Sequence, residues 1–129
     1  MPAVLRGLRS RGCKIAVVSN FDSRLPDILR AVGIHGYLDA VIYSSEAGSA
    51  KPDAAIFTRA LAVLGVAPQR AIHVGDSPRA DLEGAITAGV AGLLMRRSRV
   101  PASGTRHAIH SLDELLARLG VPQPWDNFR

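Results

Sequence analysis

AIHVGDSPRADLEGAITAG, residues 71–89, joins a predicted strand directly to a predicted helix. Residues 71–74 form a short apolar run that is typical of a buried strand. Ser77 followed by Pro78 is a favourable pair for the N-cap and first position of a helix, and Gly89 is a favourable end for it. The inward face of that helix is predicted to consist of Leu82, Ala85 and Ile86. A strand that leads straight into a helix is the repeating unit of α/β proteins.

The same alternation of strand and helix patterns continues on both sides of this stretch. Short apolar runs predict further strands at residues 14–19, 40–44 and 91–96. Apolar residues at helical spacing predict four more inward faces, which consist of Val4, Leu5 and Leu8; Leu25, Ile28, Leu29 and Val32; Ile56, Phe57, Ala60, Leu61 and Leu64; and Leu112, Leu115, Leu116 and Leu119. We therefore predict an α/β fold, a three-layer Rossmann-like parallel sheet with helices on both faces.

Polar residues and glycines predict where these helices begin and end. Asp22 or Ser23 is expected to cap the helix that follows the first strand, and Asp53 the next one. Ser111 and Glu114 form a capping box for the last helix. The glycines that are expected to end the helices are Gly12, Gly33, Gly65 and Gly120. Residues 98–105 are expected to form a loop.

The composition is that of one globular domain. Of the 129 residues, 47% are hydrophobic and 21% are charged. We predict a domain over residues 1–120 and an irregular tail over 121–129. No hydrophobic run approaches the ~20 residues of a membrane span, and the start of the chain does not resemble a signal peptide, so the expected location is the cytoplasm. The single cysteine, Cys13, cannot form an internal disulfide and is expected to pack as a small apolar residue.

The net charge of +5 would attract phosphorylated ligands, nucleic acid or anionic surfaces. Nucleic-acid binding is disfavoured because the chain has only three Phe, two Tyr and one Trp, and Trp125 and Phe128 lie in the expected tail. The densest basic cluster, Arg96, Arg97 and Arg99, is more typical of a solvated strand end than of a binding patch.

Polar residues follow the predicted strands where each strand ends. Ser19 and Asn20 end the first strand, Lys51 follows the second, and Asp76 and Asp81 follow the third. In a parallel α/β sheet the ligand site lies at the carboxyl ends of the strands. Singly, Ser19 and Asn20 could be turn residues, and Lys51 an exposed loop residue. Together, a hydroxyl, an ammonium and two carboxylates suit a phosphoryl group with a divalent cation such as Mg²⁺.

Three of these segments, in this order, resemble the second, third and fourth motifs of the haloacid dehalogenase superfamily. They are Ser19-Asn20, Lys51-Pro52 and the block GDSPRADLEGAITAG at residues 75–89. The resemblance extends from Val4 to about Leu119 and implies a hydrolase of the phosphatase type that acts on a small phosphorylated metabolite.

The resemblance also implies a role for each matching residue. Ser19 and the backbone of Asn20 would bind phosphate. Lys51 would bind phosphate too and would stabilise the charge of the transition state. Asp76, supported by Asp81, would coordinate Mg²⁺, although weakly in this chain.

One feature departs from the family pattern. The attacking group of the superfamily is an Asp on a central strand, usually in a D-x-D-x-T motif, but here the first acidic residue is Asp22 and no two Asp lie two positions apart. The resemblance implies that the chain lacks the nucleophile strand and the helical cap, so we expect negligible phosphatase activity. Three alternatives stay open: a late-start or fragment form of an enzyme, a non-catalytic phosphate- or Mg²⁺-binding or fold-complementing module, and a relative of the 2-haloacid dehalogenases.

In the family's strand order, the strands at residues 14–19 and 71–74 would be separated by the absent nucleophile strand. Their inner edges would then carry unpaired backbone groups, which are costly when buried. We expect the two strands to close up and pair directly. The alternatives are a segment donated by another copy of the chain, which would give a homo-oligomer through the exposed sheet edges, and partial disorder.

Overall fold

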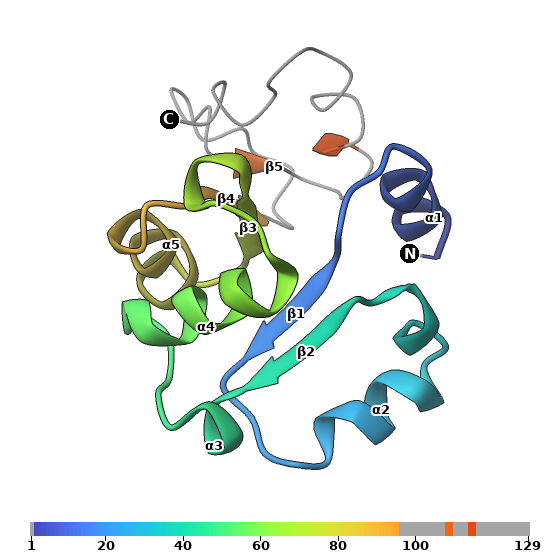
Figure 1. Cartoon of the computed structure of the whole chain (residues 1–129), viewed down its shortest axis with the longest axis horizontal. Helices are drawn as coiled ribbons and strands as arrows, with labels where there is room; N and C mark the ends of the chain where they lie inside the picture. Colours follow the sequence, from blue (N-terminus) through green and yellow to red (C-terminus); the bar gives the residue numbers. More distant parts are fainter. Residues whose placement is uncertain (1, 96–107, 110–113, 116–129) are drawn as a thin grey trace.

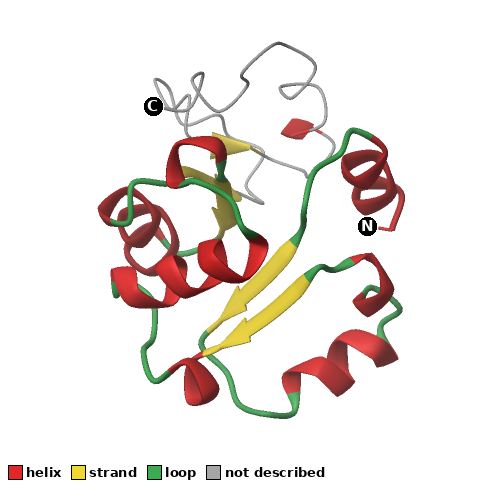
Figure 2. Cartoon of the chain, in the orientation of Figure 1, coloured by secondary structure: helices red, strands yellow, loops and turns green. Residues whose placement is uncertain are grey.

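The computed structural model describes residues 2–95, 108–109 and 114–115, and its strands alternate with helices as expected (Figure 1, Figure 2). The elements in chain order are α1 (Pro2–Ser10), β1 (Ala16–Ser19), α2 (Leu25–Ala31), η1 (His35–Tyr37), β2 (Ala40–Tyr43), α3 (Ser44–Ala47), α4 (Ala54–Leu64), η2 (Pro68–Arg70), β3 (Ile72–Gly75), η3 (Pro78–Glu83), α5 (Gly84–Thr87), β4 (Ala91–Met95) and β5 (Ala108–Ile109).

All strand pairs in the described residues are parallel, which confirms the predicted fold class. β1 pairs with β2, where Ala16 lies opposite Ala40. β3 pairs with β4, where Ile72 lies opposite Ala91, and β4 also pairs with β5. The carboxyl ends of β1 and β2 therefore lie at one edge, as do those of β3 and β4.

Helices cover both faces of these strands. On one face, α1 packs in a hydrophobic cluster made of Val4, Leu5, Leu8, Ala91, Leu93, Ile109 and Leu115. On the other face, α4 and α5 pack with β2 in a second cluster made of Ile42, Ile56, Phe57, Ala60, Ala85 and Val90. Ile72 and Val74 contact the first cluster and Ala71 contacts the second. This is expected because successive side chains along an extended backbone point to opposite faces. Cys13 is partly buried against the first cluster, as predicted.

Direct closure of β1 onto β3, which we expected from the sequence, is wrong. β1 and β2 form one sheet, β3, β4 and β5 form another, and β1 does not pair with β3. Side-chain packing joins the two strands without backbone pairing. Ile15, which directly precedes β1, packs in the first cluster together with β3 and β4, and Val18 of β1 packs in the second together with Ala71. Both clusters are thus buried while the backbones of β1 and β3 stay unpaired with each other.

Two of the predicted helix caps are confirmed and one is wrong. Asp53 accepts a hydrogen bond from the Ala55 N–H at 3.1 Å, and Ser77 Oγ accepts one from the Ala80 N–H at 3.0 Å. The helix at residues 25–31 has no side-chain cap from Asp22 or Ser23. Asp22 instead accepts hydrogen bonds from the backbone and the guanidinium of Arg24.

Three residues predicted to face inward are exposed. They are Ile28, Val32 and Ile86. Only Leu25 and Leu29 of α2 are buried, because that short helix packs along a single stripe. The helix that carries Ile86 begins with a π-helical segment, in which the Leu82 N–H donates to the Ser77 carbonyl at 3.2 Å. Such a wide turn changes the angular spacing of the side chains that follow.

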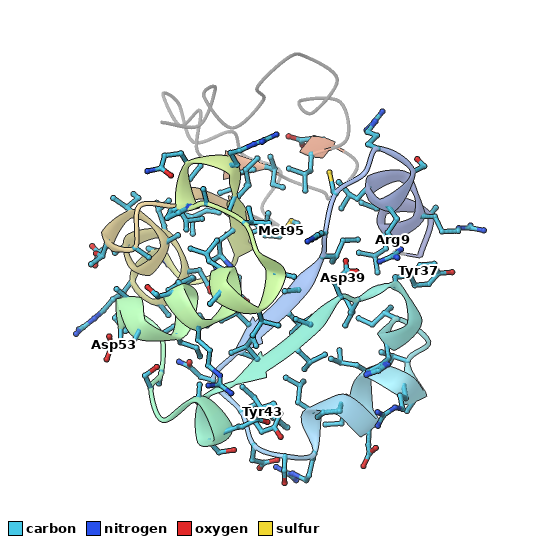
Figure 3. All side chains as sticks on the ribbon, viewed as in Figure 1. Arg9, Tyr37, Asp39, Tyr43, Asp53 and Met95 are labelled. Atoms are coloured by element: carbon cyan, nitrogen blue, oxygen red, sulfur yellow. The ribbon has the colours of Figure 1, made fainter. Side chains whose placement is uncertain are left out.

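A set of contacts from Asp39 anchors the start of β1. Asp39 Oδ2 accepts hydrogen bonds from the Ile15 N–H at 2.8 Å and from Arg9 Nη1 at 3.1 Å. Arg9 Nη1 also donates to the Tyr37 carbonyl at 3.2 Å (Figure 3). The backbone hydrogen bond from Ile15, with the bond from Arg9, lowers the pKa of Asp39. These contacts join α1, β1 and the entry to β2.

Several predictions concern residues outside the described part of the chain. They are the strand end and arginines at Arg96, Arg97 and Arg99, the loop at 98–105, most of the last helix with its cap Ser111 and its stop Gly120, and the tail at 121–129. Of that helix, Glu114 and Leu115 are described and helical, and Leu115 is buried. Within the described residues, no helix has both the length and the apolar character to cross a membrane.

Candidate functional site

Asp81 is the centre of the candidate site. Its residue is only 3% exposed, which makes it the one buried charged residue in the described part of the chain. Oδ1 lies 2.6 Å from Lys51 Nζ and 2.9 Å from His73 Nε2. Oδ2 accepts a hydrogen bond from the Ser77 N–H at 3.0 Å. Both oxygens of the carboxylate are thus hydrogen-bonded.

These contacts keep Asp81 ionised. Burial alone would raise the pKa of Asp81, but the hydrogen bonds from His73, Lys51 and the Ser77 N–H, together with the charge of Lys51, hold it far below its usual range. Taking a carboxylate out of water is costly unless it is paired and hydrogen-bonded, and both conditions are met here. The site therefore contains a fixed negative charge that neutralises part of the positive charge of the Lys51 ammonium.

The turn from β3 to the next helix brings the Asp81 side chain back against the strand. A Cβ atom added at Gly75 would overlap the Asp81 carboxylate, so glycine is required where the strand ends. The Asp81 N–H and the Leu82 N–H both donate to the Ser77 carbonyl, at 3.0 and 3.2 Å. These bonds belong to the π-helical segment at residues 78–83, a rare conformation that occurs frequently at functional sites.

Asn20 and the backbone of Lys51 bind each other at two points. The Lys51 N–H donates to Asn20 Oδ1 at 2.8 Å, and Asn20 Nδ2 donates to the Lys51 carbonyl at 3.1 Å. The next peptide bond, Lys51-Pro52, is cis. Asp53 then caps α4. Lys51 is therefore held at its backbone by the end of β1 and at its ammonium by Asp81.

Ser19 and Asp76 complete the set of residues predicted from the sequence. Ser19 is the last residue of β1 and is half-buried, whereas Asp76 directly follows β3 and is exposed. In the described residues, no three His, Cys, Asp or Glu side chains gather in a way that could hold a metal ion. The carboxylate of Asp76 suits a Mg²⁺ ion that takes one protein carboxylate, with phosphate and water as its other ligands. Both oxygens of Asp81 are already hydrogen-bonded, Oδ1 to the Lys51 ammonium and Oδ2 to the Ser77 N–H.

The structure thus joins three of the predicted site residues by hydrogen bonds, namely Asn20, Lys51 and Asp81. Their assigned roles, and those of Ser19 and Asp76, stay predictions. Sequence reasoning missed His73. A signal was present, because residues 73 and 75 are two apart on a strand and share a face. A histidine on the same strand face as the glycine that contacts Asp81 could have been placed next to that carboxylate.

Comparison with known proteins assigns the family. The family model described as "Hydrolase: haloacid dehalogenase-like hydrolase" matches residues 1–89. The chain belongs to the haloacid dehalogenase-like hydrolases. The mouse haloacid dehalogenase-like hydrolase domain-containing protein 3 is 42% identical to it over 123 residues, which cover 91% of this chain and 49% of the mouse protein. This haloacid dehalogenase-like chain therefore spans about half the length of that relative.

Solved structures give the same family and fold. The crystal structure of a HAD phosphatase from Thermococcus onnurineus is similar with a TM-score of 0.85 and 30% identity, over 92% of this chain and 55% of that one. The HAD-hydrolase YfnB from Bacillus subtilis, solved bound to magnesium, has a TM-score of 0.80 over 92% of this chain and 54% of that one. At 20% identity, this second likeness shows the fold alone. The predicted family and the parallel α/β fold are both confirmed.

Proposed function

We propose that the site binds the phosphoryl group of a small phosphorylated metabolite, and that the whole protein hydrolyses phosphate esters. The observation that carries this proposal is the Lys51 ammonium, which the buried Asp81 carboxylate holds 2.6 Å away. The pair lies next to the carboxyl ends of β1 and β3, where α/β proteins bind their ligands. The phosphatase-type structural neighbour supports the same chemistry.

Each residue has a distinct role in this proposal. The Lys51 ammonium is a point charge for phosphate oxygens and stabilises negative charge as it develops in the transition state. The Ser19 hydroxyl and the Asn20 N–H are donors for the phosphate. The Asn20 side chain is hydrogen-bonded to the Lys51 backbone, so it fixes the position of the backbone from which the Lys51 side chain extends.

Asp76 would hold Mg²⁺ in the whole protein. A bound Mg²⁺ ion would neutralise negative charge on the phosphate oxygens. Asp81 supports the same function through Lys51, because both of its oxygens are hydrogen-bonded within the protein. One carboxylate supplies only part of a coordination shell, so we expect this chain to bind Mg²⁺ weakly.

A second candidate function is complementation by another polypeptide. The observation that favours it is the separation of the sheets, because β1 and β3 are each paired on one side only within the described residues. Exposed strand edges can pair with another chain. A second copy of this chain could supply a strand that pairs with the free edges of β1 and β3. Light scattering over a range of protein concentrations tests this candidate, because it predicts an association that strengthens with concentration, and a monomer throughout would exclude the homo-oligomer.

The experiment for phosphate binding compares the chain's two lysines. We would measure the affinity for inorganic phosphate by calorimetry in the wild type, Lys51→Ala and Lys14→Ala. Lys14 is a matched control, because its ammonium donates to the Leu64 carbonyl at the C-terminal end of α4 and the change in net charge is the same. We expect Lys51→Ala to weaken binding about tenfold or more and Lys14→Ala to leave it within about twofold. Equal losses in the two variants would mean that net charge attracts the anion and that Lys51 forms no site.

A further inference from the structure

His73 takes part in the site although the predicted motifs do not include it. Its neighbours on β3, Ile72 and Val74, pack in the cluster under α1. The centroids of the His73 and Phe57 rings are 4.8 Å apart, and the ring planes lie at 84° to each other. This is an edge-to-face contact with α4. The His73 side chain is only 14% exposed. Packing against Phe57 therefore fixes the plane in which the imidazole can form hydrogen bonds.

The direction of the hydrogen bond between His73 and Asp81 follows from the chemistry of the carboxylate. Asp81 is ionised, and an ionised carboxylate only accepts hydrogen bonds. Nε2 of His73 therefore carries a proton and donates it to Oδ1 over 2.9 Å. Lys51 Nζ donates to the same oxygen. Oδ1 thus accepts hydrogen bonds from two side chains, while the Ser77 N–H donates to Oδ2.

We propose that His73 is a positioning residue that sets the location of the Lys51 ammonium by fixing Asp81 Oδ1. With three donors, from His73, Lys51 and Ser77, the carboxylate has no freedom to rotate. Without the imidazole donor, Oδ1 would be held by the lysine alone and could move with it toward solvent. The shared oxygen also leaves more of the Lys51 charge for an incoming anion. This last consequence rests on the proposed phosphate function, whereas the positioning itself does not.

The first arm of the test observes Lys51 directly and without any anion. The chain contains only two lysines, Lys51 and Lys14, so ¹H–¹⁵N spectra of the ammonium groups contain two signals to assign. His73→Phe removes the donor and keeps a ring against Phe57, whereas His73→Gln keeps an N–H donor. We expect the Lys51 signal to shift or broaden in His73→Phe and to stay at its wild-type position in His73→Gln. The Lys14 signal should not move in either variant.

A second core variant separates positioning from loss of stability. Ile42→Val shortens a buried apolar side chain of the cluster that contains Phe57. It should lower stability without shifting the Lys51 signal. An unshifted Lys51 signal in His73→Phe would overturn the inference, as would equal shifts in Ile42→Val and His73→Phe.

The second arm measures affinity for inorganic phosphate in the same variants. We expect His73→Phe to weaken binding about tenfold, the size of one lost hydrogen bond to a charged group, and His73→Gln to stay within about twofold. If the wild type binds no phosphate but its Lys51 signal responds to His73→Phe, the proposed function fails and the positioning role stands. Unchanged phosphate affinity in His73→Phe would refute the link between His73 and the anion site.

A measurement on the wild type covers the case in which His73→Phe does not fold. ¹H–¹⁵N spectra of the imidazole show which ring nitrogen of His73 carries the proton when the ring is neutral. The inference requires the proton on Nε2, hydrogen-bonded to Asp81. A neutral ring with its proton on Nδ1 would contradict the inference, because Nε2 would then have nothing to donate.

Discussion

The Lys51 ammonium and the Asp81 carboxylate lie 2.6 Å apart, and their side chains are only 13% and 4% exposed. An ion pair that is this well buried often adds little net stability, because the cost of desolvation offsets the attraction between the charges. Breaking one partner nevertheless leaves the other charge uncompensated. We therefore propose that the pair holds Lys51 in place for the proposed phosphate binding, a role distinct from simple stabilisation.

The first prediction concerns loss of the buried charge. Asp81→Asn removes the anion while keeping the size of the side chain, and it leaves the Lys51 ammonium without its counter-charge. We expect a loss of about 3 kcal/mol in the free energy of unfolding, measured by urea denaturation. Asp22→Asn is the matched control, because Asp22 pairs with Arg24 at the surface. If Asp22→Asn lowers the free energy of unfolding as much as Asp81→Asn does, burial of the Lys51–Asp81 pair does not determine the size of the loss.

The second prediction concerns pH. The pKa of Asp81 is lowered in the folded chain, so the unfolded chain binds more protons as the solution becomes acidic. The stability that Asp81 contributes is therefore present above its unfolded pKa of about 3.9 and is lost as the pH falls below it. We expect the unfolding free energy to fall below about pH 4. Asp81→Asn should show a shallower fall over the same range, and curves of equal slope would contradict the assignment.

The third prediction tests the close approach of β3 to Asp81. Gly75→Ala places a methyl group where the Asp81 carboxylate lies, so either the turn or the carboxylate must move. We expect a loss of about 1–3 kcal/mol in the free energy of unfolding, together with weaker phosphate binding. Gly36→Ala is the control, because a Cβ there meets nothing within 4 Å. A Gly75→Ala chain with wild-type stability and wild-type phosphate affinity would mean that the carboxylate is free to move.

The fourth prediction concerns turnover. The 129 residues contain no pair of aspartates two positions apart, so they do not contain the D-x-D pattern that carries the family's nucleophile. In a serine protease, loss of the nucleophile lowers turnover on the order of 10⁶-fold. We expect this chain to release negligible phosphate from an aryl phosphate in the presence of Mg²⁺. Turnover in the ordinary enzyme range of ~1–10³ s⁻¹ would show that another residue acts as the nucleophile.

The sequence predicts local structure in this chain better than it predicts long-range contacts. The strands at residues 40–44 and 91–96 and the caps at Asp53 and Ser77 depend on short patterns, and the described residues bear them out within a residue or so. The separation of β1 from β3 is a relation between distant parts of the chain, and no local pattern predicts it.

The same distinction applies to the site. The sequence predicts that both Lys51 and Asp81 belong to the site, but they are 30 residues apart, and their pairing appears only once β3 and the Lys51 loop meet in space. A histidine within an apolar run is typical of a core strand, so the role of His73 depends on its contacts with Phe57 and Asp81. The side chain of Asn20, for which the resemblance implied only a backbone role, binds the Lys51 backbone.

Phosphate binding at Lys51 is tested most directly by mapping the binding site by NMR. Inorganic phosphate is titrated into the ¹⁵N-labelled chain, and the backbone amide signals are followed. We predict that the largest shifts occur at the carboxyl ends of β1 and β3, at Ser19, Asn20 and Asp76, together with the Lys51 amide. Shifts concentrated instead at the opposite end of β1, around Lys14 and Gly65, or spread evenly over the arginines, would contradict the claim that Lys51 and its neighbours form a phosphate site.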